Sequence, residues 1–405
     1  MQAVHADSVT ISYLFTRDDG YQDEEEYTIP ILPQGTELAE GTLGILSDAK
    51  TVKVQSGEDE EVMVSITDNQ LDIYKESVNY LTGYKYLCNE QLASKLIGLL
   101  AYQQYMQSKG EKVKVDKAIR PIIHRLTNHQ NKHQLWSWWG NSENTSFWMS
   151  AHILRALKMA QDAGYPVELN LNGLKVEYAH TRPYRGMKLE DIEILHALHE
   201  WKVEADYSSA VRLLEPFVRQ LEQKEDSLAN RNKYYRPLSY LKEKLLLWEI
   251  KQQVDSVNVG DSVRPYLKKD MLEGVYCDDG RRTYYWEGNQ MINTLIAYRI
   301  IKNDPSLCKL KENMQLYILR TKERGWNTYQ ASSAVATVLT DLLAGSGGMS
   351  GTSVSVSGKD HQRITEFPYH ARLTASDSLL ISKTGKEPLL LSLIHISEPT
   401  RLRCI

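Results

Sequence analysis

The chain has 405 residues, which is enough for two or three domains with substantial cores. Its 48 Lys and Arg residues stand against 52 Asp and Glu residues and leave a net charge of -4, so bulk charge indicates neither a nucleic-acid partner nor an anionic membrane surface. No apolar run approaches the roughly 18 residues of a membrane-spanning helix, and Met1 is not followed by the basic and apolar segments of a signal peptide.

Residues 1–76 have the pattern of β-strands. Residues 9–15 alternate in part between apolar and polar side chains, and an Asp-Asp-Gly turn signal separates them from the run at residues 26–32. Two shorter runs follow at residues 51–54 and 62–66. We therefore predict an antiparallel β-sandwich, or part of one, in this region.

The sequence Tyr-Lys-Tyr-Leu-Cys-Asn-Glu-Gln at residues 84–91 directly precedes a long apolar segment. Cys88 and Gln91 are three residues apart, so one tight turn can bring the thiol sulfur onto the side-chain carboxamide carbon of the glutamine. Closing that ring with loss of ammonia gives an internal thioester, whose thiolate is a far better leaving group than an amine. The alternative is a small buried Cys at the first turn of an amphipathic helix, with Gln91 merely polar.

From about residue 71 to residue 345 the apolar residues recur at helical spacing. After the Cys-Gln turn they predict an amphipathic helix that ends near Gly110. Further helices are predicted at residues 115–126, 147–163, 189–202, 207–224, 238–254, 290–302, 307–323 and 328–343. Three segments open with a Trp followed by small or polar residues, at Trp148, Trp286 and Trp326. An irregular repeat of this kind indicates a solenoid or a closed α/α toroid, with ordinary helical packing as the alternative.

Strand character returns at residues 346–390, after a Gly- and Ser-rich joint. The last fifteen residues are different. Residues 391–401 resemble the conceptual translation of a transposase adapter used in sequencing libraries, fused onto a truncated reading frame. We therefore exclude residues 391–405, including His395 and Cys404, from the expected fold and function.

The octet resembles the thioester motif of the α2-macroglobulin and complement superfamily. The bacterial form of that motif reads aromatic-x-Cys-x-Glu-Gln at the start of a helix, and Tyr86, Cys88, Glu90 and Gln91 match it. Lys85 departs from it, because bacterial members commonly carry Pro at that position. The helix openings at Trp148 and Trp326 also resemble those of the superfamily, so the resemblance extends over most of the chain.

In this superfamily the thioester lies in an α/α toroid that is inserted into a β-sandwich of the CUB type. The resemblance therefore implies a mainly α chain with three segments before the adapter-like residues 391–405. These are CUB-like or macroglobulin-like strands at residues 1–76, the toroid at 77–345, and the returning CUB-like strands at 346–390.

The resemblance also implies roles for individual residues. Cys88 would be the leaving thiol, and Gln91 would supply the acyl carbon that becomes attached to the target. Tyr86 and Glu90 would support the thioester, although an acid in the first turn of a helix is also an ordinary stabilising residue. His180 is the nearest candidate for the downstream His that relays the acyl group to hydroxyls in some complement relatives. Its alternative is an ordinary loop histidine.

Metal and cofactor sites are not indicated. The four cysteines show no C-x-x-C or Cys/His grouping with metal spacing. The histidines His124, His129 and His133 have no acid partner and fit no ligand pattern, so we interpret them as a loop and helix edge.

The function implied by the resemblance is that of a fragment of a bacterial α2-macroglobulin-like protease inhibitor. Cleavage of a bait segment elsewhere in the full chain would expose the thioester, which would then trap the attacking protease through an amine or hydroxyl. The acyl group is spent once, so the protein would not be an enzyme. Its partners would be target proteases and the remaining macroglobulin-like domains, with no nucleic acid. It would reside in the periplasm or cell envelope, as a membrane-anchored lipoprotein.

Two alternatives come from other classes of protein. One is an α/α-toroid binding or structural module without an active thioester. The other is a toroid enzyme of the terpene cyclase or prenyltransferase kind, which needs an Asp-rich motif or a zinc set of Asp, Cys and His. The pair Asp278 and Asp279 alone supplies neither.

Overall fold

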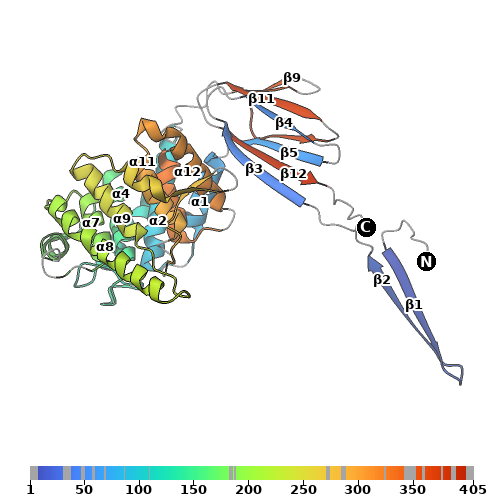
Figure 1. Cartoon of the computed structure of the whole chain (residues 1–405), viewed down its shortest axis with the longest axis horizontal. Helices are drawn as coiled ribbons and strands as arrows, with labels where there is room; N and C mark the ends of the chain where they lie inside the picture. The colour runs from blue at the N-terminus through green and yellow to red at the C-terminus, as the bar shows by residue number, and fades with distance from the viewer. Residues whose placement is uncertain are drawn as a thin grey trace.

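The computed structural model describes residues 8–30, 38–46, 51–56, 60–67, 70–85, 87–108, 110–181, 186, 188–270, 274–283, 289–322, 325–341, 353–357, 361–374, 377–384 and 389–397. Figure 1 shows a helical domain, a β-sandwich beside it, and a two-stranded hairpin beyond the sandwich. Within the described residues, no helix is both long and apolar enough to cross a membrane.

Six helices form a closed inner ring, each packed against the next, and the last packs against the first. In ring order they are α2 (Asn89–Ser108), α4 (Phe147–Asp162), α7 (Asp191–Glu200), α9 (Leu241–Val254), α11 (Gln290–Ile301) and α13 (Thr328–Ala334). The mainly α fold with an α/α toroid, predicted from the helical repeat and the resemblance, is confirmed. The ring closes because α13 returns to α2.

The remaining helices and a short hairpin complete this domain. They are α1 (Gln70–Gly83), α3 (Asp116–Asn128), α5 (Asn172–Leu174), η1 (Lys175–Thr181), α8 (Tyr207–Arg231), α10 (Gly260–Val263), η2 (Arg264–Tyr266), β6 (Leu267–Lys269), β7 (Val275–Cys277), η4 (Pro305–Leu307), α12 (Cys308–Thr321) and η6 (Val335–Leu339). Helices α1, α3, α8 and α12 each pack against members of the inner ring.

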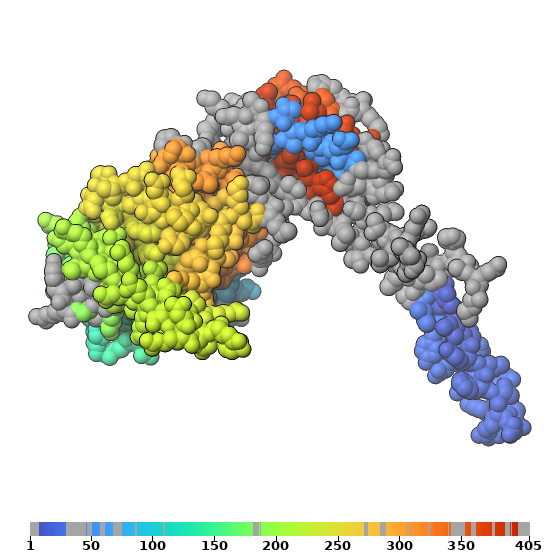
Figure 2. All heavy atoms as spheres, viewed as in Figure 1, coloured from blue at the N-terminus to red at the C-terminus, as the bar shows by residue number. Residues whose placement is uncertain are grey.

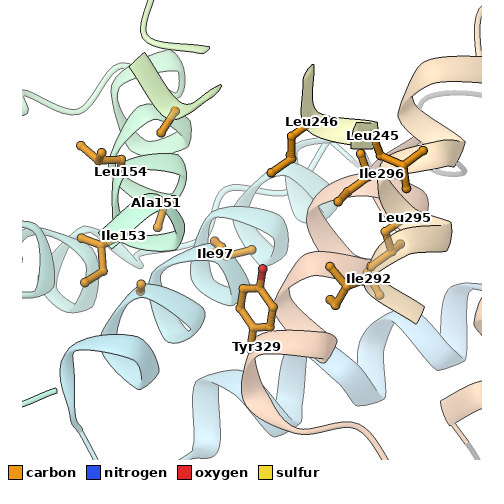
Figure 3. Close-up of a cluster of buried hydrophobic side chains, with 14 of the residues drawn as sticks. Ile97, Ala151, Ile153, Leu154, Leu245, Leu246, Ile292, Leu295, Ile296 and Tyr329 are labelled. Carbon is orange, nitrogen blue, oxygen red and sulfur yellow. The ribbon is translucent and has the colours of Figure 1, made fainter. Parts of the chain in front are cut away.

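The inner ring forms the main hydrophobic core (Figure 3). Ten of the twelve residues of α11 are buried, because this helix has neighbours on several sides. Its Ile292, Leu295 and Ile296 lie with Leu245 and Leu246 of α9 around a shared interior. Helices α2, α4 and α13 contribute Ile97, Ala151, Ile153, Leu154 and Tyr329.

The sandwich consists of two antiparallel four-stranded sheets, in the orders β10-β5-β12-β3 and β4-β11-β8-β9. The strands are β3 (Leu38–Leu46), β4 (Thr51–Gln55), β5 (Glu60–Thr67), β8 (Ser353–Ser357), β9 (His361–Ile364), β10 (Tyr369–Leu373), β11 (Ser378–Thr384) and β12 (Leu389–Ser397). Each sheet combines strands from before and after the helical domain. The toroid is therefore an insertion between strands of one sandwich.

The prediction that residues 391–405 take no part in the fold is wrong for residues 391–397. They form most of β12, which pairs with β5 on one side and β3 on the other. Leu391 is buried and Leu393 partly buried, so their alternation with Ser392 continues the inward pattern that begins at Leu389. The origin of these residues from an adapter stays a prediction, and residues 398–405 lie outside the described part of the chain.

Of the four strands predicted at residues 1–76, the last two, β4 and β5, lie in the sandwich together with β3, whereas the first two do not. β1 (Ser8–Thr16) and β2 (Gln22–Pro30) form a separate two-stranded antiparallel sheet. Gly20 in the turn between them has a φ of +86°, which Gly adopts without strain. Figure 2 shows this hairpin projecting away from both the sandwich and the toroid.

The burial of β12 can be tested with a matched pair of substitutions. Leu391 is 4% exposed in β12, whereas Leu380 is 43% exposed in β11 of the same sandwich. Leu391→Asp places a charge in the core and is expected to destabilise the sandwich by about 3 kcal/mol or more, whereas Leu380→Asp is expected to cost less than about 1 kcal/mol. Hydrogen exchange of the β5 amides measures both effects. Equal protection in the two variants would show that residue 391 does not pack inside the sandwich.

Candidate thioester site

Cys88 immediately precedes α2 and is 2% exposed. Its backbone N–H donates to Oε1 of Gln91 at 3.1 Å, and its carbonyl accepts from the backbone N–H of Leu92 at 2.9 Å. A Gln at the third helical position that accepts from the N–H of the residue before the helix is one half of a capping box. The carboxamide of Gln91 is thereby folded back over the residue that bears the thiol.

Helix α13 begins with the complete form of the same arrangement. The backbone N–H of Asn327 donates to Oε1 of Gln330 at 3.1 Å, and the backbone N–H of Gln330 donates to Oδ1 of Asn327 at 2.8 Å. Cys88 therefore occupies the position of a capping residue, and a sulfur atom replaces the usual oxygen. Ordinary helix-capping geometry thus folds the carboxamide of Gln91 back onto the backbone N–H of Cys88.

The Cys88 thiol is free in this structure. Burial, the largest influence, raises the pKa of this thiol, whereas hydrogen bonding with the backbone of Gln91 and Glu90 opposes that rise. The thiol is therefore held mainly in its protonated form at neutral pH, which suppresses its nucleophilicity. A proton must leave the sulfur before it can attack the carboxamide.

Asn89 fastens the first residue of α2 to the loop before α4. Its backbone N–H donates to the carbonyl of Trp138 at 3.0 Å, and its Nδ2 donates to the carbonyls of Ser137 and Gly140 at 2.8 and 2.9 Å. Its Oδ1 lies 2.6 Å from Nδ1 of His129. Because Asn89 Oδ1 can only accept, Nδ1 of His129 must carry the hydrogen. The side-chain amide of Asn89 is fully used in holding the start of the helix.

Glu90 points into the inner ring and is 2% exposed. Its Oε1 accepts from Ser94 Oγ at 2.7 Å and its Oε2 accepts from Thr328 Oγ1 at 2.8 Å. Ser94 Oγ also lies 2.9 Å from Nε2 of His152 and 3.0 Å from Oγ of Ser332. Burial raises the pKa of Glu90, and the two hydroxyl hydrogen bonds act in the opposite direction. These five residues connect α2, α4 and α13.

Aromatic rings lie beside this cluster. The ring of Trp148 meets the rings of Trp138 and Tyr329 edge-on, with centroids 5.8 and 5.0 Å apart, and Tyr329 also meets His152 at 4.9 Å. Tyr86, predicted from the resemblance to support the thioester, lies outside the described residues, so that role stays a prediction. Among the described residues, the aromatic side chains beside this cluster come from α4, α13 and the loop before α4.

The structure brings three of the five predicted site residues together: Cys88, Glu90 and Gln91. His180 is exposed at the last turn of η1, which packs against α5 and α7. Its relay role stays a prediction. In the part of the chain that is described, no group of three or more His, Cys, Asp and Glu residues could hold a metal ion.

Sequence reasoning missed the residues that hold Glu90. Ser94 and His152 are single polar residues within apolar helical stretches, and Thr328 and Ser332 are far away in the sequence, 238 residues beyond their partners on α2. A signal was present in the helical pattern. Ser94, His152 and Ser332 fall on buried positions, where an apolar residue is the usual choice.

A small cavity lies at the centre of the ring. Its volume is about 60 Å³, and side chains from all six inner helices line it. Charged side chains reach it in pairs: Lys242 Nζ lies 2.6 Å from Glu193 Oε1, and Arg299 donates twice to Glu249 at 2.7 Å. A cyclase would need an apolar space large enough for its hydrocarbon substrate, and this small, ion-paired cavity is not such a space.

His152 predicts a specific dependence of stability on pH. Burial, followed by repulsion from Arg155, lowers its pKa from 6.5 to about 3. The unfolded chain therefore binds more protons than the folded chain between about pH 6.5 and 3, and stability falls as the pH falls through this window. We expect this histidine to account for about 1 kcal/mol of lost unfolding free energy between pH 7 and 5.5. Urea denaturation of His152→Gln, which cannot titrate, should show a shallower loss; an unchanged slope would contradict the assignment.

Comparison with known proteins gives similarity at the level of structure. No protein-family model matches the sequence, and no curated protein has detectable sequence similarity to it. Elastase-activated alpha-2-macroglobulin from Escherichia coli aligns at 14% identity with a TM-score of 0.54, over 94% of this chain and 34% of that one. The trypsin-activated form from the same organism aligns at 14% identity with a TM-score of 0.56. This alignment covers 97% of the present chain and 27% of the E. coli chain.

A native E. coli alpha-2-macroglobulin structure that spans domain MG7 to the C-terminus aligns at 15% identity with a TM-score of 0.50. The alignment covers 94% of the present chain and 60% of the E. coli chain in that structure. The chain thus spans between about a quarter and three-fifths of these structures. Its fold is that of a part of the bacterial alpha-2-macroglobulins, the group that its Cys-x-Glu-Gln motif resembles.

Proposed function

We propose that this chain is part of a protease inhibitor of the bacterial alpha-2-macroglobulin type, which traps attacking proteases through a thioester between Cys88 and Gln91. The observation that carries the proposal is the capping geometry, in which the Gln91 carboxamide folds back onto the N–H of Cys88 at 3.1 Å. The fold shared with E. coli proteins that are activated by elastase and by trypsin supports it.

The chemistry proceeds in two steps. In the first, the Cys88 sulfur attacks the side-chain carbonyl carbon of Gln91, a C–S bond forms, the C–N bond breaks, and ammonia leaves with the proton of the thiol. In the second, an amine of the target attacks the same carbon, the C–S bond breaks, and the thiol of Cys88 regains a proton. The target is left joined to residue 91 through an amide. Each molecule reacts once, so the protein is an inhibitor and not an enzyme.

Burial protects the bond between the two steps. Cys88 is 2% exposed and Gln91 is partly buried, and Asn89 binds the loop before α4 at the start of the helix. Because a thioester hydrolyses in water, a site of this kind must stay closed until its target arrives. Within the proposal, cleavage of a bait segment elsewhere in the full-length chain opens it, Tyr86 adds to the cover, and His180 relays the acyl group to hydroxyl acceptors.

The partners and the location belong to the same proposal. The partners are target proteases and the other macroglobulin-like domains of the full-length protein. The location is the periplasm or cell envelope, where a lipid anchor on the full-length chain would hold the protein at the membrane.

One observation favours a second candidate, a toroid module that binds partners without covalent chemistry. The full capping box at Asn327 and Gln330 shows that the same hydrogen bond forms where no thiol is present. In this alternative the contact between Cys88 and Gln91 serves only to cap α2.

Labelling with isotopic methylamine separates the two candidates. The proposal predicts that one methylamine becomes attached at Gln91, located by peptide mapping, and that one new reactive thiol appears at Cys88. Cys88→Ala should take up none, because no thioester can form. Cys277→Ala removes another buried thiol and should label like the parent. Absence of label at Gln91 in the parent, or equal labelling in Cys88→Ala, would favour the non-covalent module.

A further inference from the structure

Three inner-ring helices meet beneath the start of α2 in a buried polar group that we term the Glu90 cluster: Glu90, Ser94, His152, Thr328 and Ser332. All five residues are at most 7% exposed. Hydrogen bonds of 2.7 to 3.0 Å connect them into one continuous network across α2, α4 and α13. The network crosses the seam where the last helix of the ring returns to the first.

The donors and acceptors in the cluster fix one another. The Glu90 carboxylate accepts two hydrogen bonds, which use the only hydroxyl protons of Ser94 and Thr328. Ser94 Oγ must therefore accept at its other contacts, so His152 donates to it from Nε2. Among the described residues the carboxylate of Glu90 makes no ion pair. Neutral donors, and not cations, hold it in place.

A buried carboxylate without a cation is costly, because its desolvation is repaid only by well-aligned donors. An apolar residue at this position would pack the same interface without this desolvation free energy. The carboxylate, however, fixes the direction in which the side chain of residue 90 points, because its hydrogen bonds are directional. Successive residues of a helix are rotated by about 100°, so fixing Glu90 toward α4 and α13 also fixes the rotation of Gln91, the next residue, about the helix axis.

We propose that the Glu90 cluster positions the acyl donor, with Ser94, His152 and Thr328 acting as positioning residues for the Cys88–Gln91 thioester. This inference rests on the proposed function. By holding Glu90 on the inner side of α2, the cluster fixes the first turn of the helix, in which the carboxamide of Gln91 folds back onto the N–H of Cys88. Because its members come from both sides of the seam, formation of the bond depends on closure of the ring.

Two substitutions remove a donor and keep the shape of the side chain. His152→Phe retains a ring against Tyr329, which His152 meets at 4.9 Å, but leaves Ser94 without its N–H donor. Thr328→Val removes the hydroxyl that binds Glu90. His152→Gln supplies a side-chain N–H again and serves as the conservative rescue.

Thr294→Val is the matched control. Thr294 lies on α11 of the same ring and is 0% exposed, and its hydroxyl accepts from the backbone N–H of Cys277 at 2.9 Å and donates to the carbonyl of Gln290 at 2.6 Å. The Thr294→Val variant therefore loses a comparable buried hydroxyl that makes no hydrogen bond to the Glu90 cluster. Thermal unfolding of every variant measures how far it is destabilised.

The readout is the fraction of purified full chains whose intact mass is lower by one ammonia. His152→Phe and Thr328→Val should each lower the ratio of closed to open chains about fivefold or more, His152→Gln should restore most of it, and Thr294→Val should leave it unchanged. Equal losses in Thr328→Val and Thr294→Val, or no loss in the first two variants, would overturn the inference. If His152→Phe does not fold, Thr328→Val decides the question on the same terms.

The same measurement separates this inference from the function on which it rests. A parent chain that has not lost ammonia contradicts the proposed thioester, and the inference with it. A parent chain that has lost ammonia, together with variants that lose it equally well, contradicts the inference alone.

Discussion

The hydrogen bond from the N–H of Cys88 to the carboxamide oxygen of Gln91 determines what this site can do. The first turn of any helix has N–H groups with no partner within the helix, and a Gln at the third position can fold back toward the residue before the helix. Asn327 and Gln330 use this contact at α13 for capping alone. At α2 the residue before the helix carries a thiol, so the same contact folds the carboxamide of Gln91 back onto a residue that bears a nucleophile.

The rest of the toroid holds that turn from several directions. Asn89 binds the loop before α4 through its amide, and Glu90 binds α13 and, through Ser94, α4. Glu90 and Thr328 lie 238 residues apart in the sequence, so they meet only when the ring has closed. The sandwich contributes at a larger scale, because strands from before and after the toroid share both of its sheets and keep the first and last helices together.

The parts of the fold that follow a period were predictable from the sequence. The apolar spacing predicted the long helices, and the motif predicted that a helix starts after Cys88. Strand β3 was missed because Gly41 and Gly44 interrupt its pattern. The separation of β1 and β2 from the sandwich depends on which strands pair over long distances in the sequence. The local pattern of each strand does not contain that information. Residues 391–397 pair as a strand because their alternation suits the space between β3 and β5.

The site was predictable only in its first turn. Cys88, Glu90 and Gln91 are neighbours in sequence, so their spacing carries the information. The other members of the Glu90 cluster are scattered over three helices, and their only local signal is a polar residue where the helical pattern favours an apolar one. Their importance comes from burial and from mutual hydrogen bonding, which are properties of the closed ring.

The central claim is that the start of α2 brings the Cys88 sulfur and the Gln91 carboxamide carbon together to form a bond. A crystal structure of the full chain, purified without amines, tests it most directly. Continuous electron density from the sulfur of residue 88 to the side-chain carbon of residue 91, with no density for the amide nitrogen, is the predicted result. Two separate side chains, with an intact carboxamide that only accepts the N–H of Cys88, would contradict it.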